Sequence, residues 1–254
     1  LTILETARAA LSSAEDDRWK GRPHALRTIC RTIIDLDRSM DEARRKGLWE
    51  ELLAHAQSDE EALPIAIEAA HADPTDERLW DHIEDLASTL RTPDPVAEAY
   101  HAALLKESSR DQLALLGERA IRFYEEWYEE AQKREPLLEL LFDRLPDESW
   151  VFENLKLLLD AEERWPELFS VFDRAIARAD GDTALALLED AAHTAKDFAK
   201  DPPRAIAYFE ELDRRKPGSP KTEGALERLY ERLGRNAELV SLLVRQREST
   251  TDAD

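Results

Sequence analysis

The chain has 254 residues, of which 36% are charged, and its formal net charge at pH 7 is −21. This excess of carboxylates argues against direct binding of nucleic acid or of an anionic membrane surface, because both contacts depend on Lys and Arg. A basic protein or peptide is the favoured partner, and the alternative that the acidity serves only solubility stays open.

Good helix formers such as Ala, Leu, Glu and Arg dominate, and no alternating run of β-branched residues predicts a strand. Every expected element is therefore a helix. The expected helices alternate between two types. A first helix carries anchors with spacings of 3, 1 and 3. A second helix carries a ladder with spacings of 4 and 3, often followed five residues later by a proline that lies past the helix end.

The elements follow in this order. The first pair rests on Leu4, Ala7, Arg8 and Leu11, then on Ala25, Ile29 and Thr32. The second pair rests on Trp49, Leu52, Leu53 and Ala56, then on Ala62, Ala66, Ala69 and Pro74. The third pair rests on Trp80, Ile83, Glu84 and Ala87, then on Val96, Tyr100 and Ala103. The fourth rests on Leu113, Leu116, Gly117 and Ala120, then on Arg134, Leu138, Leu141 and Pro146.

The last three pairs repeat the pattern. The fifth rests on Phe152, Leu155, Lys156 and Leu159, then on Leu168, Phe172 and Ala175. The sixth rests on Leu185, Leu188, Glu189 and Ala192, then on Ala205, Phe209, Leu212 and Pro217. The seventh rests on Leu226, Glu227 and Tyr230, then on Leu239 and Leu243. Successive ladders start 37, 34, 38, 34, 37 and 34 residues apart, and a generic antiparallel bundle does not require such a period.

This pattern resembles the tetratricopeptide repeat over almost the whole chain, most closely from Ala62 onward. The resemblance implies an all-α solenoid of about seven antiparallel helix pairs in a right-handed superhelix. Only Gly117 fills the place where the family prefers glycine, and the first helices expected at 111–133 and 183–200 are about a turn too long, as in long bacterial tetratricopeptide arrays. We expect a degenerate repeat at 1–45, clear repeats at 46–248 and a flexible acidic tail at 249–254.

The sequence contains no pattern that predicts catalysis. It has no phosphate-binding glycine loop and no zinc-type Cys/His spacing. Glu68 with His71, and Asp190 with His193, have the i, i+3 spacing of di-iron bundles, but 122 residues separate the two pairs. The one cysteine, Cys30, lies on an apolar helix and cannot form an internal disulfide, so we expect a buried thiol. We therefore expect no enzyme activity, no metal and no cofactor.

In the tetratricopeptide family the first helices line a concave groove. The resemblance therefore assigns partner binding to the residues between the anchors. These are Asp81, Asp85, Glu118, Glu153, Asn154, Asp160, Asp190 and His193. Their acidity favours a basic or amphipathic partner segment, and the alternative is that they are ordinary solvated carboxylates. The family's clamp for C-terminal carboxylates uses Lys, Arg and Asn, and only Asn154 matches it in the middle repeats.

The sequence thus predicts a non-catalytic protein–protein interaction scaffold. One alternative is an RNA-processing repeat of the half-tetratricopeptide kind, but a basic stripe occurs only near Arg228–Arg235. The other alternative, a helical enzyme domain, would need converging polar groups that the spacing does not supply. No apolar run predicts membrane insertion, and we expect a cytoplasmic protein. The apolar helix expected at 236–248 could be a cap, or it could stack on a missing repeat or on a second copy. Because the chain starts at Leu1, we expect a piece of a longer protein.

Overall fold

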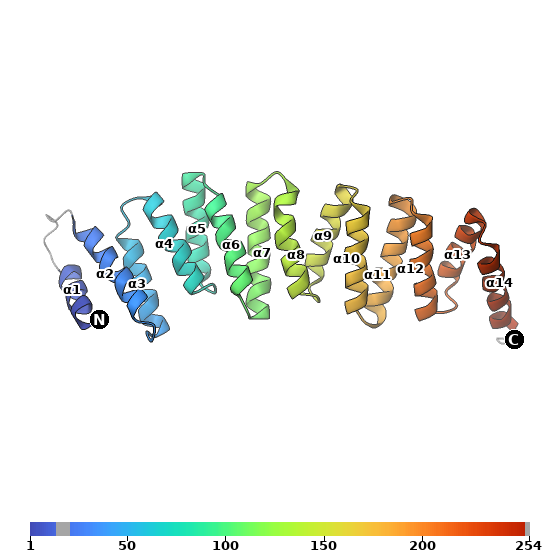
Figure 1. Ribbon diagram of the computed structural model, residues 1–254, viewed down its shortest axis with the longest axis horizontal. Helices are drawn as coiled ribbons and strands as arrows, with labels where there is room; N and C mark the ends of the chain where they lie inside the picture. Colours follow the sequence, from blue (N-terminus) through green and yellow to red (C-terminus); the bar gives the residue numbers. More distant parts are fainter. Residues whose placement is uncertain (14–20, 252–254) are drawn as a thin grey trace. The chain divides into compact units, whose positions relative to one another are not determined.

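The computed structural model describes residues 1–13 and 21–251, and in these ranges it contains fourteen α-helices, two short non-α helical turns and no strand (Figure 1). The chain divides into two compact units, Leu1–Glu130 and Ala131–Asp254. Within each unit every helix packs against the next one along the chain. The expected all-α fold of consecutive helix pairs is confirmed.

Unit 1 contains seven α-helices among its described residues. They are α1 (Thr2–Ser12), α2 (Arg22–Leu36), α3 (Glu42–Ala54), α4 (Asp59–Ala72), α5 (Glu77–Leu90), α6 (Asp94–Lys106) and α7 (Arg110–Trp127). The odd-numbered helices are the first helices of the repeat and the even-numbered ones are the second helices. Ser58 caps α4, and Asp76 caps α5, each by accepting a hydrogen bond from a backbone N–H of the first turn.

Unit 2 begins with a 3₁₀ turn (η1, Ala131–Arg134), and its described residues form seven further α-helices. They are α8 (Glu135–Arg144), α9 (Ser149–Ala161), α10 (Trp165–Arg178), α11 (Gly181–His193), α12 (Pro202–Arg215), α13 (Pro220–Leu233) and α14 (Asn236–Thr251). Here α9, α11 and α13 are first helices, and the even-numbered helices are second helices. Pro166, Pro202 and Pro220 stand in the first turns of their helices, where the missing N–H has no intrahelical acceptor to lose.

The two residue patterns form the core of both units. In unit 1 the second-helix ladder residues Ala66 and Tyr100 are fully buried, and the Trp80 ring from a first helix stacks on Tyr100 with centroids 4.3 Å apart. In unit 2 Phe172 and Ala205 are fully buried in the same way. Small ladder residues let two helices approach, and a large side chain from the neighbour fills the space.

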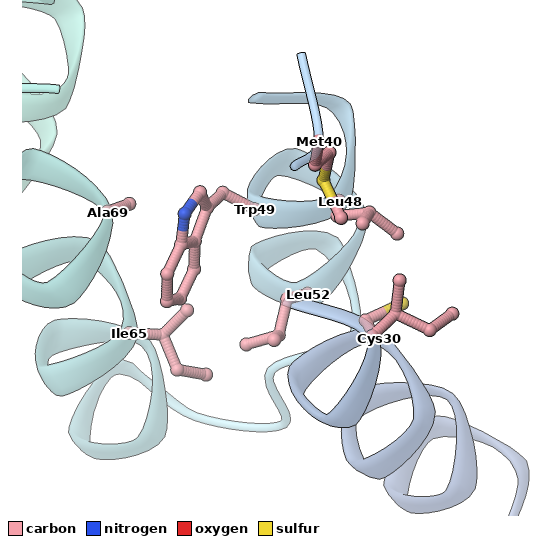
Figure 2. Packing of buried hydrophobic residues seen from close by; sticks show 8 residues of the cluster. Cys30, Met40, Leu48, Trp49, Leu52, Ile65 and Ala69 are labelled. Carbon is pink, nitrogen blue, oxygen red and sulfur yellow. The ribbon is translucent and has the colours of Figure 1, made fainter. Parts of the chain in front are cut away.

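The register of the first ladder differs from the prediction. The buried side chains of α2 are Leu26, Cys30 and Ile33, one residue after the expected Ala25, Ile29 and Thr32. Both sets have spacings of 4 and 3. The larger apolar set turns inward because its burial removes more apolar surface from water. Figure 2 shows Cys30 of this ladder pointing into the same core as Met40 and Leu48 of the next pair.

The last ladder also differs. Leu242 of α14 is buried, whereas the expected Leu243 is 44% exposed. Val240 and Val244 are exposed as well, so α14 presents an apolar face that no described residue covers. The helix extends to Thr251, into the segment 249–254 predicted as a flexible tail, and residues 252–254 lie outside the described residues.

The long first helices have a structural explanation. α7 has 18 residues and ends at Trp127, where the expected helix at 111–133 gives way to η1. The helix expected at 183–200 is α11 followed by a π-helical turn (η2, Thr194–Phe198), in which the Ala199 N–H donates to the Thr194 carbonyl. A π turn takes more residues per turn than an α turn, and it places Thr194 and Ala195 in the core.

No helix within the described residues is both long and apolar enough to cross a membrane.

Candidate functional site

Hollows recur on the face made by the first helices. In unit 1 one lies between α3 and α5, with a volume of about 420 Å³, and another lies between α5 and α7, with about 180 Å³. In unit 2 one lies between α9 and α11, with about 550 Å³, and another lies between α11 and α13, with about 280 Å³. Each of these four hollows thus lies between two successive first helices of the repeat.

The α9/α11 hollow, the largest of these four, has an apolar floor. Its apolar lining comes from the end of α8, from α9, from the end of α10 and from α11: Phe142, Pro146, Phe152, Ala175, Ala179, Ala186 and Leu187. Phe142 and Phe152 pack against each other with centroids 6.4 Å apart, and Phe152 meets Phe172 edge-on at 5.4 Å. The aromatic floor is thus continuous with the core of unit 2.

The rim of the α9/α11 hollow is acidic. Its carboxylates are Asp147, Glu148, Glu153, Asp180 and Asp190. Among the described residues that line it, Arg178 is the one basic side chain, and this guanidinium donates to the Phe142 carbonyl at 2.8 Å and to Asp143 at 2.9 Å. Five carboxylates around an apolar floor create a negative potential at a surface that can desolvate an apolar group.

Basic side chains one repeat away compensate part of this acidity. Lys156 on α9 donates to Asp190 of this rim, and in the neighbouring α11/α13 hollow Lys221 on α13 donates to Glu189 on α11 in the same way. The bond from Lys221 lowers the pKa of Glu189. Glu153 is exposed and has no ion pair with any described residue. Glu153 is therefore the least compensated helical carboxylate of this rim.

In unit 1 the predicted residues have different surroundings. Arg119 on α7 donates to Asp81 at 2.7 Å and to Glu84 at 2.9 Å, and it also donates to the Tyr100 hydroxyl at 2.9 Å. Burial would lower the pKa of Arg119, but the hydrogen bonds that it donates to Glu84 and Asp81 outweigh burial and raise the pKa. Burial together with the bond to Glu84 raises the pKa of Tyr100. Asp81 is therefore part of a structural ion network as well as of the exposed face.

Asp85 and Glu118 are exposed, and neither side chain pairs with another described residue. Glu118 lines the small α5/α7 hollow beside Arg119 and Arg122, whereas Asp81 and Asp85 do not line it. The structure thus places all three acidic residues on the first-helix face of unit 1, but it brings only Glu118 to a hollow.

The other predicted residues of unit 2 are less available. The Asn154 amide donates to the Trp150 carbonyl of its own helix at 2.9 Å, and Asp160 lies half-buried near the end of α9, outside the α9/α11 hollow. The His193 ring lies edge-on to Phe209, 5.6 Å between centroids, and its Nδ1 lies 3.4 Å from the Asp197 carboxylate. Of the predicted set in unit 2, only Glu153 and Asp190 share one hollow.

Several residues of the α9/α11 hollow are not among those predicted from the sequence. Asp147, Glu148 and Asp180 lie in the turns that precede α9 and α11, and Phe142 comes from the preceding second helix. The turn signal that starts at Pro146 indicated a helix boundary only. A repeat-by-repeat comparison of turn charges would have marked Asp180, because every one of these hollows except the α5/α7 one is lined by the turn before its second first-helix.

No group of His, Cys, Asp and Glu in the described part of the chain has the arrangement of a metal site. His71 Nε2 lies 3.1 Å from the Ala99 carbonyl, a contact between successive second helices. The two carboxylate–histidine pairs belong to different units, Glu68 with His71 in unit 1 and Asp190 with His193 in unit 2.

No family model matches the sequence, and no curated protein matches it. Among solved structures, a chain of the Naa15/Naa10 complex bound to HypK-THB is similar to this chain, with 16% sequence identity and a TM-score of 0.31. The match covers 96% of this chain and 40% of that chain, so this chain spans less than half the length of that protein. At this TM-score, no function is transferred from that protein.

Proposed function

We propose that this protein is a non-catalytic, tetratricopeptide-like scaffold that binds a basic, amphipathic segment of a protein partner on the face of its first helices. The α9/α11 hollow is the main binding site. The observation that carries the proposal is the combination of an aromatic and aliphatic floor with a rim of five carboxylates and one basic side chain, which is already paired.

An apolar side chain that enters the hollow covers Phe142 and Phe152 and removes apolar surface from water. Lys or Arg residues that flank it on the partner meet Glu153 and the turn carboxylates, which speeds encounter and fixes orientation more than it adds affinity. Nucleic acid does not fit, because this rim offers phosphate groups no unpaired cation among the described lining residues.

The test is selection of peptides from a random display library against the whole protein at an ionic strength of about 0.15 M, where exposed charges remain partly effective. The proposal predicts that the selected peptides combine aliphatic or aromatic residues with Lys or Arg. It also predicts that Glu153→Lys with Asp190→Lys weakens their binding at least about tenfold, since like charges directly opposed across an interface cost several kcal/mol.

A matched control carries the same change of charge elsewhere. Glu98→Lys on α6 with Glu163→Lys, in the loop after α9, reverses two exposed carboxylates that do not line the α9/α11 hollow. Binding should fall in the first double variant and not in the second. Equal losses in both would attribute binding to net charge alone, and acidic or uncharged selected peptides would refute the proposed partner chemistry.

A further inference from the structure

The α3/α5 hollow in unit 1 holds a buried donor that the fold does not use. Trp49 on α3 is 9% exposed, its indole nitrogen is inaccessible to solvent, and no described residue accepts a hydrogen bond from it. Figure 2 shows the ring standing between α3 and α4, beside Ile65 and Ala69, with its nitrogen at the end nearer Ala69. A buried N–H without an acceptor costs free energy, so it calls for an explanation.

The corresponding tryptophan of the next repeat shows what a purely structural indole does. Trp80 occupies the same anchor position on α5, and its Nε1 donates to the Pro74 carbonyl at 3.0 Å. That carbonyl belongs to the α4–α5 turn, which also lines the α3/α5 hollow. One tryptophan anchor therefore satisfies its N–H within the protein, and the other, whose side chain lines the α3/α5 hollow, leaves its N–H without an acceptor.

The hollow suits a small apolar group. Its volume is about 420 Å³, and its apolar lining consists of Met40, Trp49, Ala69, Ala72, Pro74 and Leu79. This volume lies in the range of about 300–1,000 Å³ that is typical of ligand sites, which combine apolar walls with a few polar groups. Trp49 supplies such a polar group as a donor, so the ligand must bring an acceptor.

The charges at the rim decide which acceptor. Four carboxylates line the hollow (Glu42, Glu50, Asp73 and Asp76) against two basic side chains, Arg45 and Lys46. The Lys46 ammonium is already bonded to Asp76. Because the rim is net negative, an anionic acceptor such as a carboxylate is repelled, whereas an uncharged carbonyl is not.

We propose that the α3/α5 hollow binds one aliphatic side chain of a peptide segment, with the uncharged main-chain carbonyl beside that side chain accepting the Trp49 Nε1–H. The occupant is thus a neutral amide joined to a branched apolar group. This site consists only of residues of unit 1 and is independent of the α9/α11 hollow of unit 2, so either site can fail while the other stands.

The test is an NMR titration of the ¹⁵N-labelled protein with N-acetyl-leucine N-methylamide, in which the tryptophan indole cross-peaks are observed. The Trp49 peak is assigned by its loss in Trp49→Phe. It should move downfield and saturate at millimolar probe, because its N–H gains an acceptor, while the Trp80 peak moves much less. N-acetyl-glycine N-methylamide lacks the aliphatic group and N-acetyl-leucine carries a carboxylate, and both should shift it less.

Two variants test the site independently of the peak itself, and a third is the control. Trp49→Phe keeps an aromatic ring and removes the donor, and it should weaken the amide probe about fivefold, the effect expected of one lost neutral hydrogen bond. Ala72→Leu adds bulk at an exposed lining residue and should abolish binding while the protein stays folded. Trp150→Phe removes a buried unpartnered indole N–H of unit 2 and should change nothing.

A Trp49 peak that stays unmoved by all three probes would overturn the proposal. So would a stronger response to the carboxylate probe than to the amide, or unchanged amide binding in Ala72→Leu.

Discussion

We predict that the stability of unit 1 depends on Arg119 far more than on an exposed ion pair of similar sequence separation. Arg119 on α7 donates to Glu84 and Asp81 on α5 and to the Tyr100 hydroxyl on α6, and its side chain is 17% exposed. The comparison pair joins Arg31 on α2 to Glu68 on α4 at 2.8 Å, and both of its side chains are more than 40% exposed. The separations are 35 residues for Glu84 with Arg119 and 37 for Arg31 with Glu68.

The magnitudes follow from burial. Arg119→Met keeps the aliphatic stem but leaves the partly buried Glu84 carboxylate with Tyr100 as its remaining partner, and we expect a loss of about 2 kcal/mol in the free energy of unfolding. Arg31→Met removes a solvated pair and should cost at most about 0.5 kcal/mol. In a double-mutant cycle of Arg119→Met with Glu84→Gln, we expect a coupling of about 1 kcal/mol or more.

The assay is urea unfolding followed by both far-UV circular dichroism and tryptophan fluorescence, because a chain of two units need not unfold in one step. Trp80 stacks on Tyr100, so one of the six tryptophans whose fluorescence is followed lies beside the network. Equal destabilisation by the two Arg→Met changes, or a coupling energy near zero, would show that burial does not distinguish these contacts.

Three further predictions test the packing, the pH dependence and the core thiol. Ala205→Leu should lower the free energy of unfolding by about 1–3 kcal/mol, because Ala205 is fully buried on α12. Ala207 on the same helix is exposed, so Ala207→Leu should be near neutral in the same urea assay. The hydrogen bond from Lys46 lowers the pKa of Asp76 below its usual 3.8, so this carboxylate stabilises the fold above about pH 4 and the contribution is lost as the pH falls through the lower folded value. Thermal unfolding from pH 6 to pH 2 should therefore show less acid destabilisation in Asp76→Asn than in the parent, since Asn can still cap α5, and identical pH profiles would contradict this assignment. Burial raises the pKa of Cys30 to about 12, so a thiol reagent at pH 8 should label it only upon unfolding. Rapid labelling of the native protein would contradict the burial of this face of α2.

The helices and most anchors could be predicted because the pattern is local. Small and aromatic residues at spacings of 4 and 3 define one helix face, and a proline five residues on marks the helix end. The ladder of Ala62, Ala66 and Ala69 is buried as predicted. On α2 the same reasoning failed by one residue, because Ala25, Ile29 and Thr32 have the same spacings as the buried set, Leu26, Cys30 and Ile33. Spacing alone does not separate the two sets; the larger apolar surface of Leu26, Cys30 and Ile33, which packs where α2 meets α1 and α3, does.

The candidate site was predictable only in part. Glu153 and Asp190 face the first-helix surface as the helical period predicts, but Asp147, Glu148 and Asp180 come from turns, to which no helical period applies. The compensation of Asp81 by Arg119 and of Asp190 by Lys156 was also missed. These partners are 38 and 34 residues apart, which is close to one repeat. A search for opposite charges one repeat apart on the first helices would therefore have found both pairs. The unused N–H of Trp49 needs the three-dimensional structure, since Trp80 has the same place in the pattern and is satisfied.

The most direct test of the central claim is to map where a selected peptide contacts the protein, by placing a photo-reactive residue at successive positions of the peptide and identifying the cross-linked residues by mass spectrometry. Binding on the first-helix face predicts cross-links to α9 and α11, concentrated on residues around Phe152, Glu153 and Ala186. Cross-links concentrated on the second helices α10 and α12, or on the exposed apolar face of α14, would contradict the claim.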